Sequence, residues 1–124
     1  VFNILMDNTD DHERNHSLRL NFDGYYDLSP AYDVVPSLHN MGYQSMIVGT
    51  RGAESSLDNA LTQINEYGIT PTRAMALMQQ VASVVDGWQK HFEMLGVCAT
   101  DMEQLSASID RPALRQQRQA VLHG

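Results

Sequence analysis

The sequence predicts a mainly α-helical fold with one short β-hairpin, because its composition changes near Ser55. Residues 55–124 are rich in Ala, Leu, Gln and Met at helical spacing, whereas residues 1–54 hold Gly, Pro, Asp, Asn and Tyr in short alternating pieces. A chain of 124 residues has the usual size of one domain, and it contains no repeat or long linker. We therefore expect a single domain over residues 1–124, with loops and a hairpin in residues 1–54 and a helical bundle in residues 55–124.

The first elements are predicted to be a helix remnant, a polar loop and the hairpin. Residues 1–8 begin with an apolar run that suits the end of a helix, and residues 8–16 are too polar to be buried. Residues 17–22 alternate polar and apolar side chains, as a half-buried strand does, and Asp23-Gly24 is a turn signal before a second strand at residues 25–28.

The rest of the first half is predicted to be a second loop with one strand. Pro30 ends the hairpin, because proline has no amide proton for the ladder. Glycines lie on both sides of residues 44–48, which we expect to form a further strand.

The second half is predicted to contain four helices. Ser55, with an acidic residue three positions later, predicts an N-cap for a helix that Gly68 ends. Thr70-Pro71 predicts the cap and first residue of a long helix that ends at Gly96. An apolar stripe supports this helix over about seven turns; it consists of Ala74, Leu77, Met78, Val81, Val84, Val85, Trp88, Phe92 and Leu95.

The last two helices are predicted from a capping box and a proline. Residues 100–103 have the capping-box pattern before a helix that reaches about Ile109, and Pro112 marks the start of the final helix. We expect the arginines near the end to form a solvated basic face; these are Arg111, Arg115 and Arg118.

Composition and charge exclude several classes of protein. The net charge of −7 argues against direct nucleic-acid binding, since like charges would repel a phosphate backbone. No apolar run approaches the roughly 20 residues that a membrane-spanning helix needs. The single Cys98 can form no internal disulfide, fits a reducing compartment and is expected to be a buried thiol. These features indicate a cytoplasmic location.

Three polar residues have the spacing of a phosphoryl-transfer site. Asp10 precedes Asn15 by five positions, and Asp33 follows the predicted hairpin. Protein kinases place a catalytic base and a metal-binding asparagine on one loop with this spacing, and bring a second metal-binding aspartate from beyond a short hairpin. Asp10 therefore fits the base, while Asn15 and Asp33 fit the ligands of magnesium, which prefers hard oxygen atoms.

The same loop also has partial likeness to two other metal sites and to a solvated turn. A calcium-binding loop that starts at Asp7 fails, because His12 stands where glycine is needed and Leu18 where glutamate is needed. His12 and His16 are four residues apart, but that spacing brings two histidines together for zinc only on a helix. A solvated turn would account for the polar residues of the loop alone. It accounts less well for the loop combined with residues 30–33.

These segments resemble the HipA-like serine/threonine kinases of bacterial toxin-antitoxin systems. The resemblance is carried by residues 8–17, which fit an N-x-D-x-H-x-x-N-x-S pattern, and residues 29–33, which fit S-P-x-Y-D. It implies a kinase-like C-terminal lobe in which Asp10 is the base, His12 braces the loop, and Asn15 and Asp33 bind magnesium and ATP.

The resemblance also implies partners. The substrate would be a protein, with an aminoacyl-tRNA synthetase as the family's example, and an antitoxin would be a second partner. The family's Gly-rich loop, strand lysine and paired glutamate are not identified in the 124 residues. They are expected in an upstream N-terminal lobe, so the segment alone is expected to be inactive. The alternative is a non-catalytic helical module that binds an antitoxin or another protein.

Overall fold

The computed structural model describes all 124 residues and confirms a mainly α-helical fold with one short hairpin. Two single turns of 3₁₀ helix, η1 and η2, complete it. The elements are α1 (Phe2–Leu5), η1 (Glu13–Asn15), β1 (Leu18–Leu20), β2 (Tyr26–Leu28), α2 (Leu57–Leu61), η2 (Ile64–Tyr67), α3 (Pro71–Asp86), α4 (Trp88–Met94), α5 (Ala99–Ile109) and α6 (Pro112–His123). None of these helices combines the length and the apolar character needed to cross a membrane.

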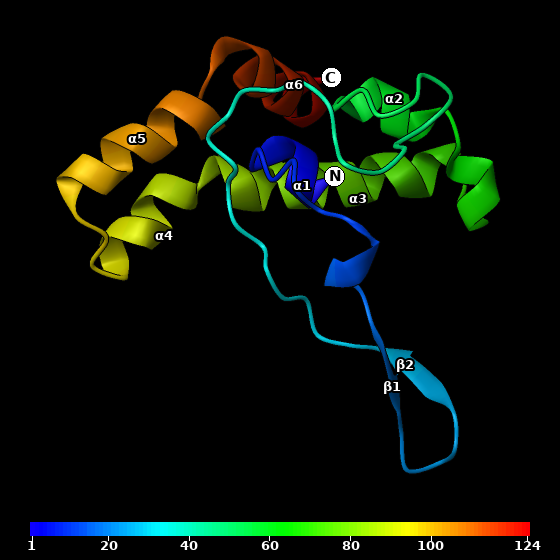
Figure 1. Ribbon diagram of the computed structural model, residues 1–124. Coiled ribbons are helices and arrows are strands. Elements are labelled where there is room, and N and C mark those ends of the chain that lie inside the picture. The colour runs from blue at the N-terminus through cyan, green and yellow to red at the C-terminus, as the bar shows by residue number, and fades with distance from the viewer.

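The long helix α3 runs through the middle of the molecule, and α1 packs against both α3 and α6 (Figure 1). The core lies where these helices meet. It consists of Ile4, Leu5, Met6, Leu57, Met78, Ala82, Val85, Trp88, Ile109 and Val121. Burial of such side chains contributes about 1.5 to 3 kcal/mol each. The first helix is therefore part of the core, although it is only four residues long.

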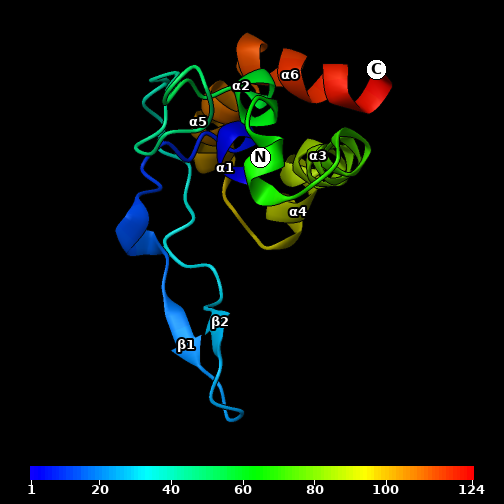
Figure 2. The same cartoon turned by 90° about the vertical axis from the view of Figure 1, so that its right-hand side faces the viewer.

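The hairpin projects away from the helical body (Figures 1 and 2). Its strands are antiparallel, with Leu18 opposite Leu28 and Leu20 opposite Tyr26. Gly24 supplies the turn with a φ of 80°, as the Asp23-Gly24 signal predicted. The expectation of a half-buried strand is wrong, because every residue of both strands is exposed. Polar and apolar side chains alternate along the strands as predicted, but no element of this chain covers their apolar face.

Two predictions in the first half need correction. Helix α1 ends at Leu5 rather than near Asn8, because Asp7 adopts a left-handed backbone with a φ of 57°. The strand predicted at residues 44–48 is absent. Isolated bridges join Tyr43 to Glu54 and Gly49 to Gly52 instead, so this stretch is held as loop.

The helix predicted from Ser55 to Gly68 is divided into α2 and η2. Its cap is Ser56, whose hydroxyl accepts a hydrogen bond from the Asn59 amide. Ser55 is occupied elsewhere, since its hydroxyl accepts a bond from Gln44 Nε2 at 2.8 Å. Gly68 ends η2 with a φ of 65°, as predicted.

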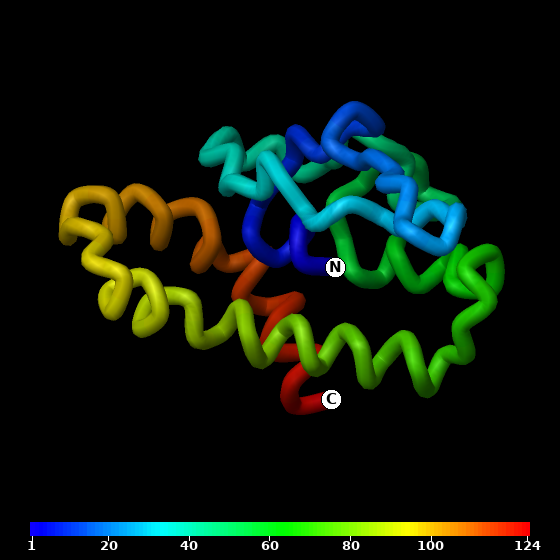
Figure 3. The backbone as a smooth tube through the Cα atoms, turned by 90° about the horizontal axis from the view of Figure 1, so that it is seen from below, coloured from blue at the N-terminus to red at the C-terminus, as the bar shows by residue number.

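The long helix predicted from Pro71 to Gly96 begins as expected but breaks at Gly87. Thr70 caps it by accepting a bond from the Arg73 amide, and Pro71 is its first residue. At Gly87 the ψ angle is 8°, far from a helical value, and Trp88 starts α4. Glycine is a poor helix former, which favours a break at this position. The prediction missed the break because the apolar stripe continues on both sides of it. Figure 3 shows α3 followed by α4, after which α5 turns back.

The final helices differ from prediction at one cap and in their side chains. Helix α5 begins at Ala99, before the predicted capping box, and its N-cap Cys98 makes no side-chain cap bond. Cys98 is also exposed rather than buried. Pro112 opens α6 as predicted. The solvated basic face is wrong for two of its three arginines. The Arg118 side chain is 3% exposed and pairs with Asp86 and Asp110, and the Arg111 side chain is 15% exposed and pairs with Asp7.

Candidate functional site

The loop of residues 7–9 is bound to the loop that follows Asp33 by backbone and hydroxyl groups. The Thr9 amide donates to Ser37 Oγ at 2.8 Å. The Thr9 carbonyl accepts from the Ser45 amide at 3.0 Å and from Ser45 Oγ at 2.9 Å. The Ser37 amide in turn donates to the Asp7 carbonyl at 2.8 Å. These bonds fix the backbone immediately before Asp10.

Asp10 is exposed to solvent, next to this anchored segment. It lines a hollow of about 480 Å³ together with polar residues of the second loop, including Ser37, His39 and Tyr43. An exposed carboxylate in such a hollow is free to meet a hydroxyl group of another molecule. The position suits a general base, which must come within hydrogen-bond reach of the proton that it accepts.

Asn15 lies at the end of η1 and is 8% exposed. Its side-chain Nδ2 donates to the Asp10 carbonyl at 3.3 Å, which closes the loop between the two residues. This bond involves the amide nitrogen. The amide oxygen, which is the atom that can bind a metal, takes no part in it. Asn15 lines a second hollow of about 530 Å³ with Ser29 and Tyr32.

Asp33 is exposed and has a left-handed backbone with a φ of 55°. The segment before it is bound to the segment around Asn15 by two sets of contacts. Tyr32 Oη donates to the Arg14 carbonyl at 2.8 Å, so the neighbours of Asp33 and Asn15 touch. The Ser29 amide donates to the Ser17 carbonyl at 2.8 Å.

The chemistry of Asn15 and Asp33 fits a magnesium ion bound together with a nucleotide. Magnesium commonly takes one or two protein oxygen ligands and completes its shell with phosphate and water. One amide oxygen and one carboxylate match that set. The chain contains no cluster of three or more His, Cys, Asp or Glu side chains suited to a metal.

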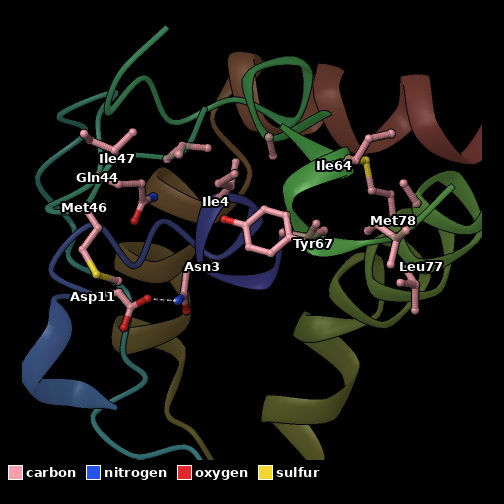
Figure 4. A pocket seen from close by; sticks show the side chains of 15 residues that line it. Asn3, Ile4, Asp11, Gln44, Met46, Ile47, Ile64, Tyr67, Leu77 and Met78 are labelled. Atoms are coloured by element: carbon pink, nitrogen blue, oxygen red, sulfur yellow. Dashed lines mark hydrogen bonds between the residues drawn. The ribbon is translucent and has the colours of Figure 1, made fainter. Parts of the chain in front are cut away.

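His12 and Asp11 have different surroundings within the same loop. His12 Nδ1 is buried and has no hydrogen-bond partner. The bracing role of His12 therefore stays a prediction. Asp11 holds the loop instead. Its carboxylate accepts from Asn3 Nδ2 at 2.8 Å (Figure 4) and lies 2.9 Å from His16 Nε2. Sequence reasoning missed Asp11, because its partner on α1 is eight residues away and follows no motif.

An apolar pocket of about 370 Å³ opens beside Asp11 (Figure 4). Its lining includes Ile4, Met46, Tyr67 and Met78. Val1 also lines it.

A family model described as the HipA-like C-terminal domain matches residues 1–88. The chain belongs to this family. The match contains Asp10, His12, Asn15 and Asp33, and it ends at Trp88, the first residue of α4. No curated protein and no solved structure matches the chain. Helices α5 and α6 therefore lie outside the part that the family describes.

Proposed function

We propose that this HipA-like domain is the catalytic lobe of an ATP-dependent serine/threonine protein kinase. In this proposal the Asp10 carboxylate would orient the acceptor hydroxyl and take its proton as the oxygen bonds to the terminal phosphorus of ATP, while the bond from that phosphorus to the bridging oxygen breaks and ADP leaves. Asn15 and Asp33 would hold magnesium, which supplies charge neutralisation for the phosphates. His12 keeps its assignment as the residue that braces the loop.

One observation carries the proposal beyond the family match. The bond from Tyr32 to the Arg14 carbonyl joins the two motif segments, one residue before Asp33 and one residue before Asn15. The two metal-binding candidates come from opposite ends of the hairpin, so the contact between their neighbours Tyr32 and Arg14 is not given by proximity in sequence. Phosphoryl transfer needs such positioning, because the protein contributes orientation and charge rather than covalent chemistry.

The wider setting of the activity is proposed from the family. We expect a cytoplasmic toxin with a protein substrate of the translation machinery, such as an aminoacyl-tRNA synthetase, and an antitoxin as its regulator. The phosphate-binding elements would come from an N-terminal lobe. Within the 124 residues the only lysine, Lys90, lies on α4, so it does not supply the strand lysine of a kinase.

The test is phosphate transfer from labelled ATP by the protein expressed from its complete reading frame. Asp10→Ala should lower the rate by about 100-fold or more, since a general base alone contributes that much. Asp33→Ala should lower it by a similar factor, since it would remove a ligand of the ion that neutralises phosphate charge. Asp23→Ala removes an equally exposed carboxylate at the hairpin turn and should leave the rate unchanged. Equal activity in all four proteins would remove the site assignment.

A non-catalytic interaction module is the second candidate, and the hairpin is the observation in its favour. Its apolar residues Leu18, Leu20, Phe22 and Leu28 are between 59% and 109% exposed. Contiguous exposed apolar surface marks sites of protein association. A wild-type protein that binds its partner but transfers no phosphate would favour this alternative.

A further inference from the structure

Asp7 is a buried charge at the start of the loop that carries Asp10. The residue is 0% exposed and has a left-handed backbone. Its carboxylate accepts a hydrogen bond from Ser108 Oγ on α5 and lies 2.6 Å from Arg111 Nη1. A buried carboxylate needs such partners, because an unpaired charge is costly inside a protein. The side chain is held by residues more than 100 positions away.

Arg111 also reaches the second loop of the site. Its Nη1 donates to Asn40 Oδ1 at 3.0 Å. Asn40 belongs to the stretch after Asp33 and has a left-handed backbone with a φ of 51°. One guanidinium group therefore lies between Asp7, three residues before Asp10, and Asn40, seven residues after Asp33.

We infer that Arg111 is a positioning residue that holds the two loops of the site in one arrangement. The bonds of Thr9 to Ser37 and Ser45 join the same two loops near Asp10. Arg111 fixes them from the side of the helical body, at the N-cap of α6. This residue lies outside residues 1–88, so the support of the site extends beyond the part that the family model matches. The kinetic consequence of this inference rests on the proposed function; the coupling of the loops does not.

Arg118, which is buried, shows what a purely structural role looks like. Arg118 pairs with Asp86 and Asp110 and donates to the Ile109 carbonyl, and none of these groups belongs to the two loops. Arg111 instead has one partner on each loop, Asp7 on the first and Asn40 on the second. A change at Arg111 should therefore alter the site even in a fully folded protein.

Asn40→Gly tests the link without burying an unpaired charge. Glycine accepts the left-handed backbone and removes only the Oδ1 acceptor. Leu38→Gly is the matched control, since Leu38 lies in the same loop with a φ of 60° but has no bond to Arg111. Arg111→Met removes the other partner. Should that variant fail to fold because Asp7 is left without its cation, the double variant Asp7→Asn, Arg111→Met removes that charge and is used in its place.

The measurement is amide exchange at Thr9 and Ser45, followed by NMR in the protein expressed from its complete reading frame. We expect exchange about tenfold faster in Asn40→Gly and Arg111→Met than in Leu38→Gly, since local opening governs these amides. Equal exchange in Asn40→Gly, Arg111→Met and Leu38→Gly would overturn the inference, whatever the activity.

Kinetics separate positioning from loss of structure. At a temperature where circular dichroism shows every variant folded, kcat should fall about tenfold in Asn40→Gly while KM for ATP changes little, because a small misplacement slows the chemical step. An unchanged kcat beside faster exchange would refute the positioning role. If the wild type transfers no phosphate, the proposed function fails, whereas faster exchange in the same samples would still support the coupling of the loops.

Discussion

The helical body and the hairpin use their side chains in opposite ways. In the body even charged groups are buried and paired, such as Asp7 with Arg111 and Arg118 with Asp110. In the hairpin even large apolar groups are exposed, with Phe22 at 109% and Leu18 at 68%. An isolated two-stranded hairpin is marginally stable in water at best. The body is stabilised by a buried apolar core, whereas the hairpin has only its backbone ladder and polar hydrogen bonds.

This contrast indicates which region positions the candidate site. The hairpin connects the segment of Asn15 to the segment of Asp33, yet the bonds that hold both segments lie at its base and on the body. Tyr32 bonds to the Arg14 carbonyl, and Ser29 bonds to Ser17, below the two strands. The geometry near Asp10 depends on Thr9, whose amide and carbonyl bond to Ser37 and Ser45 of the second loop. The tip of the hairpin is therefore free to serve another purpose.

The two regions should differ most in how much an arginine substitution lowers the free energy of unfolding. Arg118→Ala should lower the free energy of unfolding by about 3 to 5 kcal/mol, because it leaves the Asp110 carboxylate, whose side chain is 7% exposed, with only the more distant cation of Arg115 at 3.8 Å. Arg19→Ala in β1 should change it by less than about 0.5 kcal/mol, as exposed substitutions usually do. Urea unfolding followed by circular dichroism measures both. Similar losses for the two variants would mean that the body and the hairpin are not separated as described.

Local signals in the sequence predicted much of the fold. The Asp23-Gly24 turn, the Thr70 cap and the start of α6 at Pro112 are correct, since each depends on the backbone preferences of adjacent residues. The break at Gly87 was not predicted, because the apolar stripe continues across it. The burial of Arg118 was missed because one of its partners, Asp86, is 32 residues away.

The sequence indicated the residue types of the candidate site but not the distant residues that hold its loops in place. The spacing of Asp10, Asn15 and Asp33 is a local pattern and was readable from the chain. The contact of Asp7 with Ser108 joins residues 101 positions apart, and no periodicity records such a pair. The candidate site residues thus lie in short motifs, whereas the groups that hold their loops come from distant parts of the chain.

Glycines offer a second comparison, with a smaller expected effect. A Cβ at Gly49 would collide with the backbone oxygen of Asn59, so Gly49→Ala should lower the free energy of unfolding by about 3 kcal/mol. At Gly24 a Cβ would meet nothing within 4 Å, and only its φ of 80° opposes alanine. The strain there is confined to the hairpin, so the loss should stay below about 1 kcal/mol. Thermal and urea unfolding of the two variants measure the difference; a larger loss at Gly24 would contradict it.

The smallest effect is expected on the apolar face of the hairpin. Leu20 is 59% exposed, so Leu20→Ser should change the free energy of unfolding of the 124-residue chain by less than about 0.5 kcal/mol. Leu114→Ser, at a residue that is 1% exposed, is the control and should cost several times more. The same pair measured in the protein expressed from its complete reading frame sharpens the comparison. A cost at Leu20 that appears only there would show that another part of that protein covers the hairpin, since burial is what makes a leucine contribute to stability.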